Sequence, residues 1–287
     1  MQNEQPIVSV KNFGVEFPSG GGRFTAVNNI SFDINKGEVV AIVDESGSGN
    51  SVTGLSIIQL LSEASGASME GSIVLNIDGQ STEVTTAKKN VMSTIRGKHV
   101  SMIFQEPLTS LNPVYTVGNQ VAEAVMLHQG LHRKAANERA LEMFDRVRIP
   151  EAARRLKEYP HQMSGGMRQR VMIAMALSCD PTVLIADEPT TALDVTIQAQ
   201  ILGLMRQLQD ETDAAVMIIT HDMGVVAEVA DDVVVMNRSK LVESGSVFDI
   251  FERPQEPYTQ ALLASVPKLG SMAGTTKPAR FDLVDFQ

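Results

Sequence analysis

Uninterrupted apolar runs recur along the chain and predict strands that are buried on both faces. Four such runs occur, at residues 39–43, 100–104, 183–186 and 215–220. Strands of a parallel sheet covered by helices on both sides have continuous Val, Ile and Leu runs, whereas half-exposed strands alternate apolar with polar residues. The pattern therefore predicts an α/β fold built on a parallel sheet.

Segments with alternating apolar and polar positions predict antiparallel strands outside this core. Residues 7–17 and 24–34 carry β-branched and aromatic residues in alternation, and the glycine-rich turn 18–22 joins them. We expect these two segments to form an antiparallel β flap ahead of the first buried strand. Further strands are expected at residues 72–77, which lead into a turn at Asp78-Gly79, and at residues 233–236 and 240–243, a hairpin joined by Asn237-Arg238.

Helical spacing of apolar residues begins after the second buried run. From about residue 116 to 157 this spacing predicts a mainly helical subdomain inserted into the core. Other helices are predicted from Ser164 to about Ser178, along the apolar stripe at residues 197–208, and at residues 258–264. The expected organisation is residues 1–108 and 181–250 as the two parts of the core, residues 109–180 as the helical subdomain and residues 251–287 as a tail.

A glycine-and-serine loop follows the first buried run and is typical of a phosphate-binding loop. Gly47 and Gly49 let backbone N–H groups approach an anion, and a helix around Ser51 would direct its free N–H groups at that anion. Two positions depart from the usual pattern, because Asp44 stands for the first glycine and Asn50 for the lysine. Losing the lysine removes a charge-assisted hydrogen bond of roughly 1.5–3 kcal/mol, which weakens nucleotide binding about tenfold to a hundredfold. A glycine-rich turn without a ligand is the alternative interpretation of this stretch.

Polar residues stand at the carboxyl ends of the other buried runs. Gln105 ends one run, Asp187 and Glu188 end the next, and His221 ends the last. Each residue alone has a structural explanation as a capping or turn residue. Because the carboxyl ends of parallel strands share one edge of the sheet, where ligands bind, we expect these groups to form one site beside the loop.

The chemistry that suits this set is phosphoryl transfer to water. Ser51 and Asp187 could hold Mg²⁺ between phosphate oxygens, and Gln105 could touch the metal or the attacking water. Glu188 could orient or deprotonate that water, and His221 could stabilise the γ-phosphate. Positioning and charge neutralisation carry the rate of such a reaction.

Two more features bear on ligand binding. Ser164 is a natural N-cap, and with Gly165 and Gly166 it would leave free N–H groups at the start of a helix, a second anion site. Phe17 could lie against a flat ring such as adenine or serve as a core aromatic residue.

Charge and hydropathy narrow the range of partners. The chain has 24 Lys and Arg residues against 34 Asp and Glu residues, a formal net charge of −10, which argues against nucleic acid as the main partner. No apolar run approaches the ~20 residues that cross a bilayer, so we expect membrane contact to go through a partner protein.

With these residues in place, the sequence resembles the ATP-binding-cassette (ABC) ATPases over nearly its whole length. The matching segments are residues 44–51 as an altered Walker A motif, Gln105 as the Q-loop, 164–169 as the signature, 183–188 as Walker B, 191–194 as the D-loop and His221 as the switch histidine. Residues 104–113 and the tail motif at 257–263 are similar to the dipeptide and oligopeptide importers. Residues 148–152 and 167–203 look closest to the first cassette of glutathione-import ATPases.

The resemblance implies a P-loop NTPase with a RecA-like core that binds ATP and Mg²⁺. ATP would contact Phe17 and the loop residues Asp44, Glu45, Ser46, Gly47, Ser48, Gly49, Asn50, Ser51 and Val52. It also implies a head-to-tail dimer in which Ser164, Gly165, Gly166 and Asp194 face the ATP of a second cassette.

The same resemblance implies the partners and the location. The helical subdomain would dock on two inner-membrane permease subunits, and a periplasmic solute-binding protein would supply the peptide. The chain would then sit as a peripheral protein on the cytoplasmic face of a bacterial inner membrane, with no role for nucleic acid.

Three functions remain open at this stage. The first is an ATP-hydrolysing, energy-coupling subunit of a peptide or glutathione importer. The second is a catalytically inactive cassette with a structural or regulatory role, which Asp44 and Asn50 favour. The third is a soluble ABC protein of translation or DNA repair, which the acidic charge and the importer-like tail disfavour.

Overall fold

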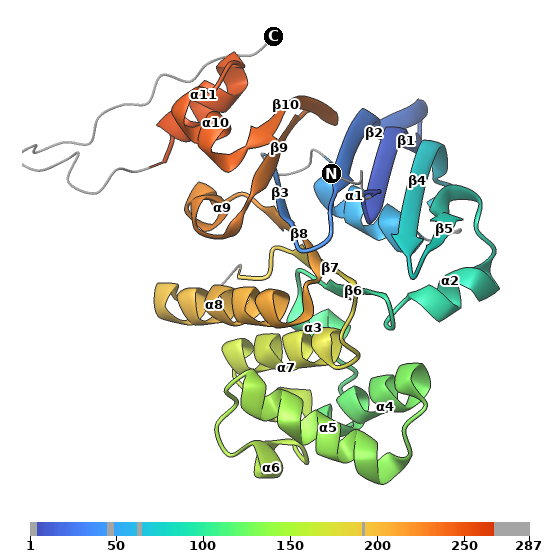
Figure 1. The fold of residues 1–287 in the computed structure, drawn as a ribbon, viewed down its shortest axis with the longest axis vertical. Helices are drawn as coiled ribbons and strands as arrows, with labels where there is room; N and C mark the ends of the chain where they lie inside the picture. The colour runs from blue at the N-terminus through green and yellow to red at the C-terminus, as the bar shows by residue number, and fades with distance from the viewer. Residues whose placement is uncertain (1–4, 45–48, 62–64, 191–192, 267–287) are drawn as a thin grey trace, which may run out of the picture.

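A six-stranded sheet forms the centre of the described part of the chain (Figure 1). The computed structural model describes residues 5–44, 49–61, 65–190 and 193–266. In spatial order the strands are β10 (Lys240–Ser246), β9 (Asp232–Asn237), β3 (Val39–Val43), β8 (Ala215–Thr220), β7 (Val183–Asp187) and β6 (Val100–Ile103). Strands β9, β3, β8, β7 and β6 run parallel, and β10 pairs antiparallel with β9.

Successive residues of the parallel strands enter different hydrophobic clusters, which explains the uninterrupted apolar runs. In β7, Val183 and Ile185 face one cluster whereas Leu184 and Ala186 face another. Side chains alternate across a strand, so a strand covered on both faces needs an apolar residue at every position. The prediction of a parallel-sheet core is confirmed.

A second, antiparallel sheet packs beside the first. Its order is β2 (Gly22–Ile34), β1 (Val8–Ser19), β4 (Ser68–Ile77) and β5 (Gln80–Glu83) among the described residues. The helix α1 (Asn50–Ile57) packs between the two sheets, because Ile57 lies in one cluster with Val10 of β1 and Ile185 of β7. The expected flap is therefore present.

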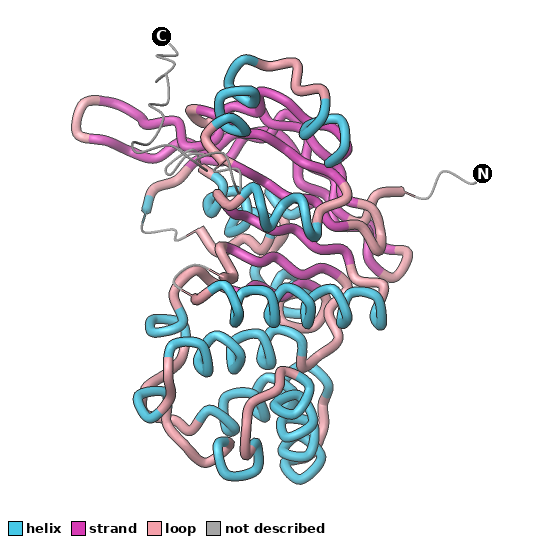
Figure 2. Tube along the Cα trace, turned by 90° about the vertical axis from the view of Figure 1, so that its left-hand side faces the viewer, coloured by secondary structure: helices cyan, strands magenta, loops and turns pink. Residues whose placement is uncertain are grey.

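Helices cover the large sheet and extend below it. Figure 1 shows α4 to α7 beneath the sheet, and Figure 2 shows the strands confined to the upper part of the molecule. The remaining helices are α2 (Lys89–Ile95), α3 (Pro107–Ser110), α4 (Val117–Gln129), α5 (Arg133–Arg146), α6 (Ala152–Arg155), α7 (Gly165–Leu177), α8 (Val195–Thr212), α9 (Met223–Val229), α10 (Val247–Glu252) and α11 (Pro257–Ala264), with 3₁₀ turns at Val84–Thr86 and Pro160–Gln162. Within the described residues, none of the helices combines the length and apolar character of a bilayer-crossing segment.

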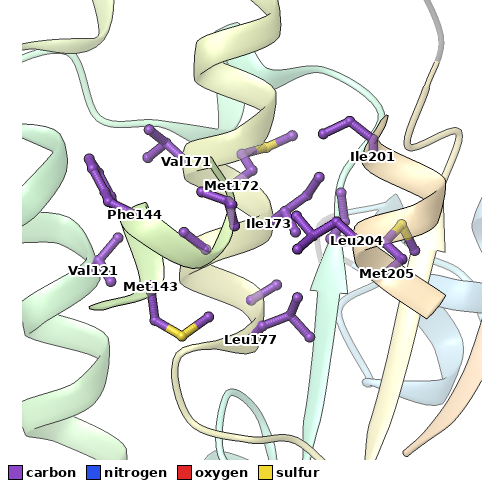
Figure 3. Close-up of a cluster of buried hydrophobic side chains, with 14 of the residues drawn as sticks. Val121, Met143, Phe144, Val171, Met172, Ile173, Leu177, Ile201, Leu204 and Met205 are labelled. Carbon is purple, nitrogen blue, oxygen red and sulfur yellow. The ribbon is translucent and has the colours of Figure 1, made fainter. Parts of the chain in front are cut away.

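The largest buried cluster joins the lower helices to the sheet. Figure 3 shows Phe144 of α5 against α7, and Ile201 of α8 on the other side of α7. Helix α7 is buried on most sides because it lies between these elements, and Val171, Met172 and Ile173 are consecutive core residues. Helix α7 is thus fixed by packing along its length.

One local expectation requires correction, whereas the mainly helical character predicted for residues 116–157 is confirmed. The strands predicted at 233–236 and 240–243 do form a hairpin, but its turn is Arg238-Ser239, both with positive φ, rather than Asn237-Arg238. Ser239 is held there by β2, since its hydroxyl donates to Thr25 O at 2.9 Å and its carbonyl accepts from Asn28 N at 2.7 Å. The span 116–157 holds three separate helices, which Gly130 at the C-cap of α4 and Arg148 with positive φ help to separate.

Candidate functional site

The phosphate-binding loop predicted after β3 leads directly into α1. Asp44 lies beside a cavity of about 310 Å³, and Glu45, Ser46, Gly47 and Ser48 lie outside the described residues. Gly49 is the N-cap of α1 with φ of 92°, and no side chain caps the helix there. The first turn of α1 therefore borders the cavity at Asn50, Ser51 and Val52.

The structure gives a reason for Gly49 in addition to the one that the sequence suggested. A Cβ at this position would lie 1.9 Å from the carbonyl oxygen of Ala26 on β2. The backbone of the loop thus touches the antiparallel sheet, and the positive φ is one that residues with a side chain seldom adopt. The glycine serves close backbone packing whether or not an anion is bound.

Asn50 occupies the position expected for the lysine, and its side chain is buried. Only 4% of the residue is exposed, and neither its amide nitrogen nor its amide oxygen has a hydrogen-bond partner among the described residues. Leaving a buried polar group unsatisfied costs about 1–3 kcal/mol. Asn50 lines the cavity, so a ligand there is within reach of this unpaired amide.

The strand-end residues meet as the sheet argument predicted. Gln105 Nε2 donates a hydrogen bond of 2.9 Å to Glu188 Oε2. His221 Nδ1 lies 3.5 Å from Glu188 Oε1, which makes an ion pair when the imidazole is protonated. Glu188 itself has φ of 44°, a left-handed conformation that is uncommon for a residue with a side chain. Polar groups from two other strand ends therefore converge on the Glu188 carboxylate.

Ser51 and Asp187 form the second part of the cluster. The Ser51 hydroxyl donates to Asp187 Oδ1 at 3.0 Å. Burial raises the pKa of Asp187 above its ordinary value, and the negative charge of Glu188 acts in the same direction, whereas the hydrogen bond from Ser51 opposes them. A hydroxyl and a buried carboxylate side by side are the hard oxygen donors that Mg²⁺ takes when substrate phosphates complete its shell. Among the described residues, no group of three or more His, Cys, Asp or Glu side chains is arranged to hold a metal ion.

Aromatic and acidic residues both line the cavity. Phe17 and Phe24 of the antiparallel sheet line it together with Asp44, Gln105 and Glu188. Phe17 also packs partly against the core, which agrees with the interpretation as a core aromatic residue, and contact with a flat ring stays a prediction. Phe24 was not expected from the sequence; 55% of this large apolar residue is exposed.

The residues predicted as the second anion site lie elsewhere. Ser164 caps α7 by accepting a hydrogen bond from Met167 N at 3.3 Å, as expected. Asp194 caps α8 by accepting from Ile197 N at 3.0 Å. Neither these residues nor Gly165 and Gly166 line the cavity that holds Asn50. Within one chain, the two candidate anion sites are therefore separate.

Two positioning contacts escaped the sequence analysis. Gln169 of α7 is 3% exposed, and its Nε2 donates to the carbonyl oxygen of Pro189 at 2.6 Å, next to Glu188. Arg96 follows α2 and donates to the carbonyls of Ile58 and Gln59, at 2.6 and 2.8 Å, where α1 ends. The sequence holds no clear signal for either contact, because Gln169 stands between Arg168 and Arg170 in a polar stretch of α7.

Comparisons with known proteins agree with this geometry. Residues 27–191 match the family described as ABC transporter, and residues 242–282 match the family described as the C-terminal region of oligopeptide/dipeptide transporters. The glutathione import ATP-binding protein GsiA of Pectobacterium atrosepticum is 57% identical over 99% of this chain, and that of Escherichia coli (strain K12) is 53% identical over 98%. The chain spans 46% and 45% of these two relatives, about half their length.

Solved structures share the fold. A dimeric post-hydrolysis structure of the ATP-binding cassette MJ0796 bound to ADP and Pi has a TM-score of 0.74 and 27% identity, and it covers 84% of this chain and 98% of its own. The structure of cbiO1 from Clostridium perfringens, described as part of the ABC transporter complex cbiONQ, has a TM-score of 0.70 and 25% identity. The match covers 88% of this chain and 93% of that chain.

Proposed function

The chain belongs to the ABC transporter family, and from this premise we propose that it is the ATP-binding, energy-coupling subunit of an importer for peptides or glutathione. The match of its C-terminal region to oligopeptide/dipeptide transporters and its similarity to glutathione-import proteins support that substrate class. Chemical energy would come from ATP hydrolysis, and the permease partners would move the solute.

The observation that carries the proposal is the convergence of Gln105 and His221 on Glu188 beside the Ser51 and Asp187 pair. Ser51 and Asp187 would hold Mg²⁺, which supplies positive charge to the phosphate oxygens when bound. Glu188 would orient or deprotonate the attacking water, because its carboxylate is fixed from two sides. His221 would stabilise the γ-phosphate, and Gln105 would report whether the site is occupied.

A second cassette would complete the active sites. Ser164, Gly165 and Gly166 stand at the N-terminus of α7, outside the chain's own cavity, so they are available to the ATP of a partner. Asp194 stands at the start of the neighbouring α8, and Val195 beside it is 82% exposed. The similar cassette MJ0796 is described as a dimer bound to ADP and Pi, which supports a shared-site arrangement for this chain.

The assembly would be asymmetric. Asp44 and Asn50 weaken the site built on this chain's own loop, whereas Ser164 to Gln169, Glu188 and His221 match the family pattern. The N-terminus of α7 in this chain would therefore complete a competent ATP site on the partner cassette. The chain's own site would bind ATP weakly or hydrolyse it slowly.

The permease would dock where the core meets the lower helices. A cavity of about 190 Å³ lies between the end of α1, β6, α4 and α7, and it is lined by Leu60, Met102, Phe104 and Met175. Leu60 is 43% exposed, so an apolar partner segment would bury it there. This docking would place the chain at the cytoplasmic face of the inner membrane, and a solute-binding protein would deliver the peptide on the opposite side.

Complementation between two variants tests the shared sites. One partner is the chain itself, and the other carries Asp44→Gly and Asn50→Lys, which repair its loop, together with Ser164→Arg, which disables its α7 N-terminus. We expect each protein alone to hydrolyse Mg-ATP slowly and their mixture to be at least about tenfold faster, the size of a lost charge-assisted contact. A mixture no faster than its components, when the repaired chain without Ser164→Arg is active, would refute the shared-site proposal.

The inactive cassette is the second candidate, and the observation that favours it is the buried Asn50 amide, which has no hydrogen-bond partner among the described residues. In that case the repaired chain would gain ATP binding, but the complementation mixture would remain inactive.

A further inference from the structure

His221 lies in a two-residue connector between the end of β8 and the start of α9. Its side chain is 57% exposed, and its Nδ1 is 3.5 Å from Glu188 Oε1. Because an imidazole that is this exposed has room to turn, its position depends on the backbone that carries it. The contacts of the other connector residue, Asp222, therefore bear on where His221 points.

Asp222 holds the connector to three different elements. Its backbone N–H donates to Thr220 Oγ1 at the end of β8, at 3.1 Å. Its Oδ1 accepts from the backbone N–H groups of Gly224 and Val225, at 2.8 and 3.4 Å, and so caps α9. Its Oδ2 accepts from Gln198 Nε2 of α8 at 3.1 Å. One carboxylate oxygen thus serves the helix that Asp222 begins, and the other reaches a helix that is distant in the sequence.

The hydrogen bond from Gln198 is not needed to start α9. An N-cap side chain satisfies free N–H groups of a helix with one oxygen, and Asp222 Oδ1 already does so. Gln198 itself stands on a fixed support, because its backbone N–H donates to Asp194 O at 2.9 Å near the start of α8. What the Gln198 side chain adds is a sideways restraint on the connector.

A second contact joins the same two helices away from His221. Arg206 Nη1 of α8 donates to the carbonyl oxygen of Glu228, near the other end of α9, at 2.9 Å. Leu202 of α8 and Val225 of α9 belong to one hydrophobic cluster. The two helices are therefore joined along their length, and of the two polar contacts it is the one from Gln198 that acts beside His221.

We propose that Gln198 is a positioning residue for ATP hydrolysis, which holds Asp222 in place and thereby keeps the His221 imidazole directed at Glu188 and the γ-phosphate. The inference rests on the proposed hydrolytic function and deepens it. Gln198 is not among the described residues that line the cavity, so it acts through Asp222 and not by contact with the nucleotide.

Steady-state kinetics of the loop-repaired chain, Asp44→Gly with Asn50→Lys, tests this role. Gln198→Met removes the donor to Asp222, and we expect kcat for Mg-ATP to fall at least about tenfold, because a small misplacement of a reacting group is costly. The KM should change by less than about twofold, since the residues that line the cavity are unaltered. Gln198→Lys keeps a donor for Asp222 and should retain most of the activity, whereas Gln198→Glu places a like charge there and should not.

Two other variants of α8 separate positioning from a general loosening of the helices. Gln207→Met is the matched control, because it also removes an amide that donates to a carboxylate, that of Glu211 on the same helix, at 3.0 Å. Arg206→Met removes the other polar contact between α8 and α9. Both should leave kcat within about twofold of the repaired chain. A loss in Gln198→Met no larger than that in either of these variants would overturn the proposal.

NMR of the imidazole groups gives a readout that needs no nucleotide. In the chain with its natural loop, Gln198→Met should shift the His221 signal, which is assigned by its loss in His221→Ala. Gln207→Met and Arg206→Met should leave that signal in place. An unmoved His221 signal in Gln198→Met would overturn the proposal. A repaired chain that hydrolyses no ATP, together with a shifted His221 signal, would instead reject the hydrolytic function, while the restraint of His221 by Gln198 would stand.

Discussion

The hydrogen bond from Gln169 to Pro189 gives a prediction whose size follows from the structure. Gln169→Met keeps the length of the side chain and removes the donor, so the carbonyl of Pro189 loses the 2.6 Å hydrogen bond that it accepts. Both residues are buried, so water cannot replace the lost donor without a local opening. An unsatisfied buried carbonyl costs about 1–3 kcal/mol, and a swap of similar volume adds little to this. We expect the free energy of unfolding to fall by that amount.

Urea denaturation followed by circular dichroism measures this change, and hydrogen exchange locates it. The amide of Glu188 donates to Ile219 O at 2.9 Å, and its exchange should accelerate because Pro189 is no longer held by α7. Gln120→Met is the control: its Nε2 also donates to backbone carbonyls, of Asn112 and Tyr115, but at exposed positions where water substitutes. The control should change stability by less than about 0.5 kcal/mol. Equal losses in the two variants would refute the argument that burial sets the cost.

Three other changes give measurable outcomes. Gly49→Ala should unfold at a clearly lower urea concentration than Gly21→Ala, because the new Cβ meets the Ala26 carbonyl at 1.9 Å, whereas Gly21 has no atom within 4 Å; equal midpoints would contradict this. Phe144→Ala should lower the free energy of unfolding by about 3–5 kcal/mol, since the side chain is fully buried between helices. Asp187→Asn should stabilise the metal-free protein at pH 7 and lose this advantage as the pH falls. The reason is that folding raises the pKa of Asp187. Its ionised carboxylate therefore destabilises the native state above the folded pKa, whereas the protonated carboxyl does not. A stability difference between the two proteins that is constant with pH would exclude this cause.

The hydrophobic pattern was sufficient to predict the strands of the core, because a strand that is buried on both faces has an uninterrupted run of apolar residues. Residues 215–220 are the clearest example, since the apolar run and β8 coincide. The meeting of Gln105, Glu188 and His221 was predictable for a related reason: parallel strands place their carboxyl ends together. Their individual distances were not predictable, because these depend on the left-handed backbone of Glu188 and on side-chain rotamers.

The hydrophobic pattern did not predict contacts between segments that are distant in the sequence. The turn at Arg238-Ser239 follows from a bond to Thr25, and no local preference of the hairpin reveals it. From the sequence, Gly49 was expected to let the backbone approach an anion, which stays a prediction, but the sequence did not reveal the close approach of Gly49 to the Ala26 carbonyl. The positions 45–48, 191 and 192 lie outside the described residues, so their expected roles stay predictions.

Helix α1 is short, and contacts hold it at both ends. Its eight residues span ~12 Å at the usual helical rise. At its start, Gly49 packs closely against the Ala26 backbone of β2. Just beyond its end, Arg96 donates hydrogen bonds to the backbone carbonyls, and Arg96 stands four residues before β6 begins. Arg96 leads into β6, the strand that Gln105 follows. The two ends of α1 are therefore tied to different parts of the site: the first turn to β2, and the last turn to the segment that leads to Gln105.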